Sequence, residues 1–91
     1  MPQITKEVKV KNAQGLHARP AALFVQIASR YNSDVTIQRD NEKVNGKSIM
    51  GLMSLLAPQG TRMTITAVGA DAAEAVRALE VVVNERFGEV E

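Results

Sequence analysis

Residues 15–28, Gly-Leu-His-Ala-Arg-Pro-Ala-Ala-Leu-Phe-Val-Gln-Ile-Ala, join a loop to an amphipathic helix and decide how the first third of the chain folds. Pro20 suits the first turn of a helix because it lacks a backbone N–H. Apolar side chains at positions 21, 24, 25 and 28 then follow the spacing of one helical face. The stretch predicts a helix that begins near Pro20, buries one side and fades near residues 30–32.

Four segments around this helix alternate between apolar and polar side chains, a pattern typical of half-buried strands. Residues 4–11 show it clearly, with Val8 and Val10 on the face that also carries Ile4 and Lys6. The other three expected strands span residues 35–39, 42–44 and 62–67. A turn-like Asp-Asn pair at positions 40 and 41 makes the middle two a hairpin.

A short helix is expected after the hairpin. Ser48 is a natural N-cap because its hydroxyl can accept an otherwise unpaired backbone N–H. The expected core-facing side chains of this helix are Ile49, Leu52, Met53 and Leu56, and the Pro-Gln-Gly sequence at 58–60 ends it.

The last expected helix begins at Asp71, which with Glu74 three residues later resembles a capping box. One face of this helix carries Ala75, Leu79, Val82 and Val83, and the helix ends before Gly88. The resulting order is β-α-β-β-α-β-α. Alternating strands need one solvated face, so the pattern predicts an α+β fold, a two-layer sandwich of an antiparallel sheet with helices on one side. The strand order does not follow from this pattern.

Composition narrows the class of protein. The 91 residues fit one domain, residues 1–91. A net charge of +1 and only 3% aromatic residues argue against a nucleic-acid partner. One histidine and no cysteine argue against a metal site. No apolar run approaches a membrane span, so we expect a cytoplasmic protein with no membrane insertion.

His17 is the only histidine and lies at the expected start of the first helix. Neutral imidazole is an available nucleophile near neutral pH. A helix N-terminus offers unpaired N–H groups and partial positive charge, and Arg19 can reach the same space. These features suit transfer of a phosphoryl group, which needs an in-line nucleophile and positive charge around its oxygens. A structural reading, with His17 as a cap or surface residue, remains open from the residue types alone.

The run from Gly15 to Ala22 resembles the active-site signature of HPr, the histidine-containing phosphocarrier family of the bacterial phosphoenolpyruvate–sugar phosphotransferase system. A second run, Lys-Ser-Ile-Met-Gly-Leu-Met-Ser-Leu at 47–55, resembles the family's regulatory-serine signature. The resemblance covers nearly the whole chain. It implies an open-faced β-sandwich of four antiparallel strands in the order 1-4-2-3, covered by three helices.

The resemblance also implies a chemistry. Enzyme I would pass a phosphoryl group to Nδ1 of His17, and phospho-His17 would donate it to IIA domains of sugar permeases, with Arg19 steadying the phosphoryl oxygens. The protein would be a stoichiometric phosphocarrier rather than an enzyme. It would need no cofactor and no metal, and we expect a monomer.

Ser48 has a second reading beside that of a helix cap. The matching family serine is a target of HPr kinase/phosphorylase in many bacteria, and phosphorylation there regulates catabolism through a regulatory protein. The short helix also carries more apolar side chains than one face can bury. We therefore expect Leu16, Met50 and Leu55 to form an apolar patch near His17 that docks partners.

Two alternatives stay open. One is the nitrogen-related phosphorelay carrier, which usually departs from the 47–55 signature that this chain keeps. The other is a non-catalytic regulatory binding protein on the same fold. Such family members lack the active histidine, whereas this chain has both His17 and Arg19.

Overall fold

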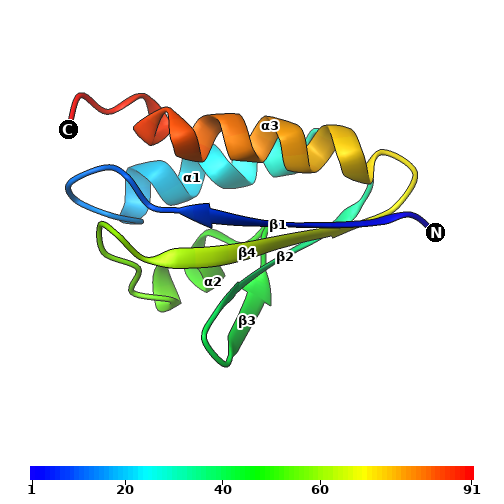
Figure 1. Cartoon of the computed structure of the whole chain (residues 1–91), viewed down its shortest axis with the longest axis horizontal. Coiled ribbons are helices and arrows are strands. Elements are labelled where there is room, and N and C mark those ends of the chain that lie inside the picture. The colour runs from blue at the N-terminus through cyan, green and yellow to red at the C-terminus, as the bar shows by residue number, and fades with distance from the viewer.

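A computed structural model describes all 91 residues as one layer of strands and one layer of helices (Figure 1). Their order matches the one expected from the sequence. The elements are β1 (Gln3–Lys9), α1 (Ala18–Ala28), β2 (Asp34–Arg39), β3 (Glu42–Asn45), α2 (Ile49–Ser54), β4 (Arg62–Val68), α3 (Ala72–Asn84) and a short 3-10 turn, η1 (Arg86–Gly88). None of the helices is long and apolar enough to cross a membrane.

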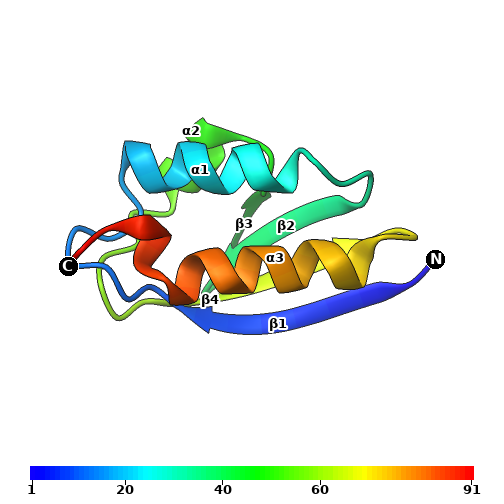
Figure 2. The same ribbon diagram turned by 90° about the horizontal axis from the view of Figure 1, so that it is seen from above.

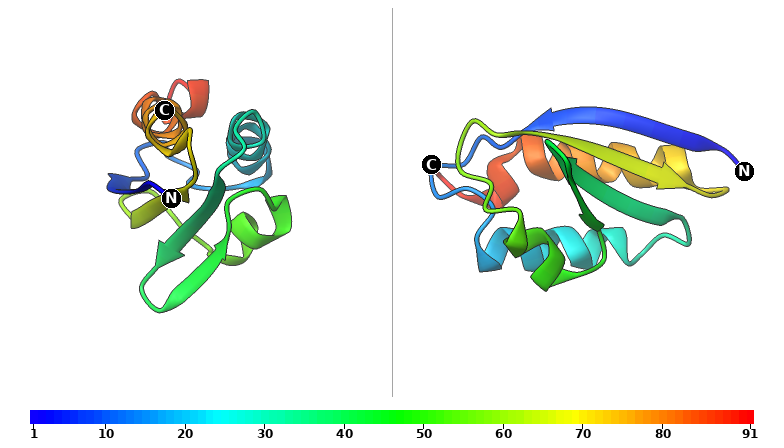
Figure 3. Two further views of the ribbon diagram at one scale, coloured as in Figure 1. Left: turned by 90° about the vertical axis from the view of Figure 1, so that its right-hand side faces the viewer. Right: turned by 90° about the horizontal axis from the view of Figure 1, so that it is seen from below.

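The four strands form one antiparallel sheet in the order β1-β4-β2-β3. Val8 of β1 is paired with Met63 of β4, and Ile65 of β4 with Ile37 of β2, so large apolar residues share register positions. Helices α1 and α3 lie side by side over one face of the sheet, and α2 packs against α1 and β3 (Figures 2 and 3). The α+β sandwich and its 1-4-2-3 strand order are therefore confirmed.

The core lies between the sheet and the helices. Every second residue of β4 is buried, namely Met63, Ile65 and Ala67, and Phe24 of α1 and Leu79 of α3 belong to the same cluster. The opposite face of the sheet stays open and polar. There the Thr5 and Thr66 hydroxyls are hydrogen-bonded across β1 and β4 at 3.2 Å.

The start of α1 differs slightly from the expectation. The helix begins at Ala18, two residues before Pro20, so proline occupies its third position. This is tolerated because the first four N–H groups of a helix have no intrahelical partner in any case. The change places His17 at the N-cap itself.

The expected capping box at the start of α3 is wrong. Asp71 occupies the N-cap but makes no side-chain bond to its own helix. Its carboxylate instead accepts the backbone N–H groups of Asn32 and Ser33, at 2.8 and 2.9 Å, and the Ser33 hydroxyl. Three donors from the α1–β2 loop thus replace the helix's own N–H groups, and Asp71 ties that loop to α3.

The expected orientation of the short helix is also wrong in part. Leu52 is the only buried residue of α2, whereas Ile49 and Met53 are exposed. The helix ends at Ser54, and Leu56 then takes a left-handed φ of 50°. That reversal directs Leu55 into the core and leaves Leu56 exposed, the opposite of the expectation for both residues.

Candidate functional site

His17 lies at the mouth of α1 in an extended conformation, with φ of −83° and ψ of −170°. Its carbonyl accepts the Ala21 N–H at 3.0 Å, but its imidazole caps no backbone group. The ring is half-buried, with 35% of the side chain exposed. The imidazole is therefore free for contacts other than helix capping.

The loop before His17 is held against the segment after α2. The Leu16 N–H donates to the Ala57 carbonyl at 2.9 Å. Gly15 has a φ of +72°, and a Cβ at this position would lie 2.5 Å from the same oxygen. Only glycine fits such a left-handed position in close contact with backbone. Gly15 thus fixes the path of the loop that delivers His17.

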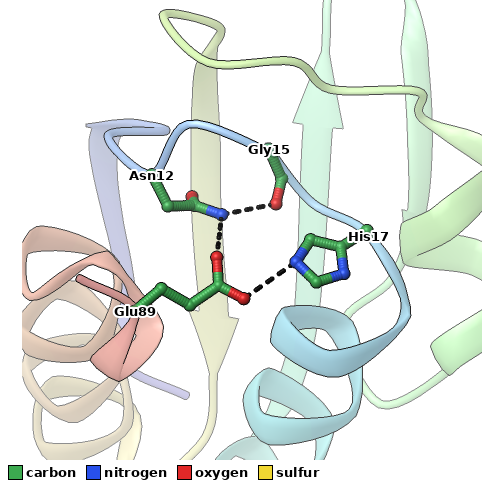
Figure 4. A network of polar contacts seen from close by, with 4 residues as sticks. All are labelled: Asn12, Gly15, His17 and Glu89. Carbon is green, nitrogen blue, oxygen red and sulfur yellow. Dashed lines mark hydrogen bonds and ion pairs between the residues drawn. The ribbon is translucent and has the colours of Figure 1, made fainter. Parts of the chain in front are cut away.

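The other end of the chain supplies the main polar partner of His17. Glu89 accepts with both carboxylate oxygens, one 2.8 Å from His17 Nε2 and the other 2.9 Å from Asn12 Nδ2 (Figure 4). Asn12 Nδ2 also donates to the Gly15 carbonyl at 2.6 Å. Residues 12, 17 and 89 therefore form one connected network at the helix mouth.

The chain reaches this network through an unusual turn. Arg86, Phe87 and Gly88 all have left-handed φ values, of 57°, 54° and 77°. Such a conformation costs about 1–2 kcal/mol for a residue with a Cβ. Phe87 is buried with 6% exposure, and its burial offsets that cost. The turn reverses the chain after α3 and places Glu89 over His17.

The charges around Glu89 favour its ionised form. The hydrogen bond from Asn12, together with the hydrogen bond and charge of His17 and the charge of Arg19, holds the pKa of Glu89 below its ordinary value of 4.5, against the opposing effect of desolvation. Near neutral pH, Glu89 is thus a carboxylate, which can only accept hydrogen bonds.

Two hollows meet at His17. One is lined by Gln14, His17, Arg19 and the C-terminal residues Phe87 to Glu91. The other lies between His17 and the exposed apolar residues Met53 and Leu56 at the end of α2. His17 and Arg19 therefore line one hollow, and an apolar surface adjoins His17.

The residues expected to form that apolar surface are only partly correct. Met50 is 80% exposed, but Leu16 and Leu55 are 5% and 2% exposed and belong to the core. Leu16 is buried because its N–H is bonded to Ala57, which draws the loop inward. The apolar residues beside His17 are instead Met53 and Leu56. With the exposed Ile49 and Met50 at the start of the same segment, they make up what we name the α2 face.

Ser48 occupies the N-cap of α2, as the sequence predicts. Its hydroxyl oxygen accepts the Gly51 N–H at 3.0 Å. Ser48 precedes the α2 face, whose last residue, Leu56, lines the hollow beside His17. The two signature residues His17 and Ser48 therefore flank one apolar surface.

Asn12 and Glu89 were not predicted from the sequence. Asn12 is fully buried in a loop segment, and Glu89 is 72 positions from His17. Nothing in their local pattern distinguishes them from surface polar residues. No group of three or more His, Asp or Glu side chains is arranged to hold a metal ion.

Comparisons with known proteins show what the whole chain is similar to. A family model described as "PTS HPr component phosphorylation site" matches residues 4–85. The phosphocarrier protein HPr of Neisseria meningitidis is 46% identical over 88 residues, which are 97% of this chain and 99% of that protein. The HPr-like protein Crh of Bacillus subtilis is 51% identical over 82 residues, 90% of this chain and 96% of Crh.

Solved structures are similar over the same range. A crystal structure of HPr from Thermoanaerobacter tengcongensis has a TM-score of 0.90 and 48% identity, and covers all of both chains. The crystal structure of Bacillus subtilis Crh, described as a domain-swapped dimer, has a TM-score of 0.75 with 51% identity, covering 91% of this chain and 95% of that one.

Proposed function

Because the chain belongs to the HPr family of phosphotransferase-system phosphocarriers, we propose that His17 accepts a phosphoryl group from phospho-enzyme I and passes it to IIA domains of sugar permeases. The transfer forms a bond between phosphorus and Nδ1 and breaks the bond between phosphorus and the donor. The protein is modified stoichiometrically and acts as a carrier rather than as an enzyme.

The main support for this proposal is the difference in hydrogen bonding between the two ring nitrogens of His17. Nε2 of His17 is bonded to Glu89, whereas Nδ1 makes no hydrogen bond and points away from Glu89 (Figure 4). The ring lies at the N-terminus of an eleven-residue helix, whose unpaired N–H groups favour an anion. Arg19, exposed in the first turn, lines the same hollow and supplies a cation for the phosphoryl oxygens.

The α2 face supports docking of enzyme I and of the IIA domains. Its side chains are exposed although apolar, and methionine adapts to partners of different shape. Met50 and Met53 lie one turn apart on α2, and Met53 together with Leu56, which follows the helix, lines the hollow beside His17. A partner seated there would bring its own reacting group to the histidine.

A second role, in catabolite regulation through Ser48, is favoured by two observations. The Ser48 hydroxyl is at a helix N-cap, where a phosphate is tolerated electrostatically. The similarity to Crh, whose structure is described by its part in catabolite repression, points the same way. We propose that an HPr kinase/phosphorylase modifies Ser48 and that the product binds a regulatory protein through the α2 face.

The nitrogen-related carrier is a weaker candidate, because residues 47–55 keep the serine signature of the sugar branch. We further propose that the protein works as a monomer in the cytoplasm. The similar Crh structure is a dimer. Sedimentation of the purified protein should give a mass of 9.9 kDa, and a mass of twice that value would contradict the monomer.

Labelling tests the main proposal. The protein is incubated with radioactive phosphoenolpyruvate, Mg²⁺ and enzyme I, and the bound phosphate is examined for the acid lability and alkali stability of phosphohistidine. Wild type is expected to be labelled and His17→Ala to be unlabelled. Absence of label on wild type, or equal label on His17→Ala, would refute the proposal.

A further inference from the structure

The contact between His17 and Glu89 determines which ring nitrogen carries the proton. An ionised carboxylate only accepts hydrogen bonds, so the nitrogen that faces it must donate. At 2.8 Å from Glu89 Oε2, Nε2 of a neutral ring therefore holds the hydrogen. The lone pair is then left on Nδ1, the nitrogen without a partner.

Asn12 fixes Glu89 in turn, and its own orientation is unambiguous. One atom of its amide lies 2.6 Å from the Gly15 carbonyl and 2.9 Å from Glu89 Oε1, and both of those oxygens are acceptors. That atom must be the NH₂ nitrogen, because a reversed amide would place an oxygen against two oxygens. Asn12 is fully buried and its Oδ1 is unpartnered, so the side chain keeps this orientation at some energetic cost.

We propose that Glu89 is a positioning residue, held by Asn12, that keeps His17 in the tautomer whose Nδ1 lone pair is free to accept a phosphoryl group. The inference rests on the proposed function, since it matters only if Nδ1 is the acceptor. It assigns to the C-terminal segment a part in the chemistry that neither signature run contains.

The carboxylate has a second effect during transfer. As the Nδ1 lone pair becomes the bond to phosphorus, the donor recovers its bonding pair and the ring gains positive charge. The proton on Nε2 stays in place, so no base is needed. Glu89 lies against the ring on the side away from Nδ1 and balances that charge, while Arg19, which lines the same hollow, supplies a cation for the incoming phosphoryl oxygens.

Replacing Glu89 by glutamine gives an unusually sharp test. The Asn12 NH₂ group can only donate, so it selects the carbonyl oxygen of the new amide. The NH₂ of Gln then faces Nε2 of His17, which has to accept, and the ring proton moves to Nδ1. Glu89→Gln should thus reverse the tautomer, whereas Glu89→Ala leaves the ring to water and enforces neither form.

The experiment combines two measurements on wild type, Glu89→Gln and Glu89→Ala. ¹⁵N NMR of the imidazole at a pH where the ring is neutral reports the tautomer. Single-turnover transfer from phospho-enzyme I reports reactivity. We expect the Nε2–H form in wild type, a shift to Nδ1–H in Glu89→Gln, and transfer rates in the order wild type, Ala, Gln, with Gln about 2- to 10-fold slower than Ala.

This order separates positioning from other roles of Glu89. A merely structural role would make the isosteric Gln milder than Ala, and simple removal of negative charge would affect both variants alike. Glu85→Gln is the control, because it removes an exposed carboxylate at the end of α3 that has no hydrogen bond to His17 or Asn12. It should behave as wild type in both measurements.

The inference is overturned if Glu89→Gln keeps the Nε2–H tautomer, or if it accepts the phosphoryl group at least as fast as Glu89→Ala. Failure of the proposed function looks different, because wild type itself would then take no label from phospho-enzyme I, whatever its tautomer.

Discussion

Truncating Met50 to alanine should weaken partner docking and leave the fold nearly unchanged. Met50 is 80% exposed and extends from α2, so little packing is lost in the free protein. Surface substitutions of this kind change stability by about 0.5 kcal/mol or less. The matched control is Leu52→Ala, two residues later in the same helix but fully buried. Its removal leaves a cavity and should cost about 2–5 kcal/mol.

The effect on docking follows from the same exposure. Complete burial of a methionine side chain is worth about 1.5–3 kcal/mol. Four-fifths of it is still available for burial by a partner, which amounts to about 1.2–2.4 kcal/mol. At 1.4 kcal/mol per factor of ten, Met50→Ala should weaken binding to enzyme I by about 7- to 50-fold.

The assay measures phosphoryl transfer from enzyme I as a function of the concentration of the carrier, alongside thermal unfolding. Met50→Ala should raise KM and leave kcat and the Tm close to wild type. Leu52→Ala should lower the Tm by about 8 °C or more, since 1 kcal/mol corresponds to about 4–8 °C in a domain of this size. An unchanged KM for Met50→Ala, or a Tm loss matching that of Leu52→Ala, would refute the assignment of Met50 to a docking surface.

Three further predictions concern residues that stabilise turns and helix starts in the fold. Ser48→Ala removes the acceptor of the Gly51 N–H and should lower stability by about 1 kcal/mol in denaturant unfolding, while Ser48→Asp keeps a cap and should lose less; equal losses would contradict the capping role. Gly15→Ala must move backbone at Ala57 and should lower the free energy of unfolding by more than about 2 kcal/mol. Gly88 is also left-handed but has open space at the position of a Cβ, so Gly88→Ala should lower it by only about 1 kcal/mol. Similar losses in the two variants would argue against the close contact at Gly15. The hydrogen bonds from Ser33 and Asn32 lower the pKa of Asp71 from its ordinary 3.8. The stabilisation from ionised Asp71 is therefore complete above pH 3.8 and is lost as the pH falls through the lowered pKa, so the stability difference between wild type and Asp71→Asn should shrink on acidification below about pH 4. A pH-independent difference would show that the Asp71 charge is not involved.

The sheet and the helices could be predicted because their signals are local. Alternation in β4 puts Met63, Ile65 and Ala67 on one side, and all three are buried. The strand order could not be obtained in this way, since it depends on which strands pair across the whole chain. It came from the family resemblance, and the pairing of β1 with β4 confirms it.

The errors in α2 have a common physical cause. Helical periodicity assigned Ile49, Met53 and Leu56 to the core, but the periodicity applies only while the helix continues. With six residues, α2 has less than two full turns, and the left-handed Leu56 reverses the chain immediately afterwards. Local pattern gave no sign of that reversal, which exchanges the expected positions of Leu55 and Leu56 relative to the core.

Half of the candidate site could be predicted and half could not, for a similar reason. His17 and Arg19 stand together in a specific run, so their chemistry can be interpreted from residue type and position. Glu89 approaches His17 only because Arg86, Phe87 and Gly88 turn left-handed, and a left-handed Arg or Phe has no sequence signature. The acidic partner of the histidine is therefore set by tertiary structure alone.

The opposed charges at this site suit a carrier better than they suit a storage site. A group that bound the phosphoryl only by attraction would hold it too tightly to release it, because tighter binding of the loaded state raises the barrier to onward transfer. Arg19 attracts the phosphoryl oxygens, whereas Glu89 supports the ring but repels the same oxygens once they arrive. Because Arg19 and Glu89 line the same hollow beside the ring, each charge limits the effect of the other on the phosphoryl group, and the loaded state stays close in free energy to the free state. Replacing Arg19 by alanine should then slow acceptance more than release. Removing the Glu89 charge should slow acceptance through the ring tautomer and slow release through the loss of this repulsion. The two half-reactions can be measured separately with phospho-enzyme I as the donor and a IIA domain as the acceptor. Equal slowing of both by Arg19→Ala, or release at the wild-type rate in Glu89→Ala, would exclude this balance.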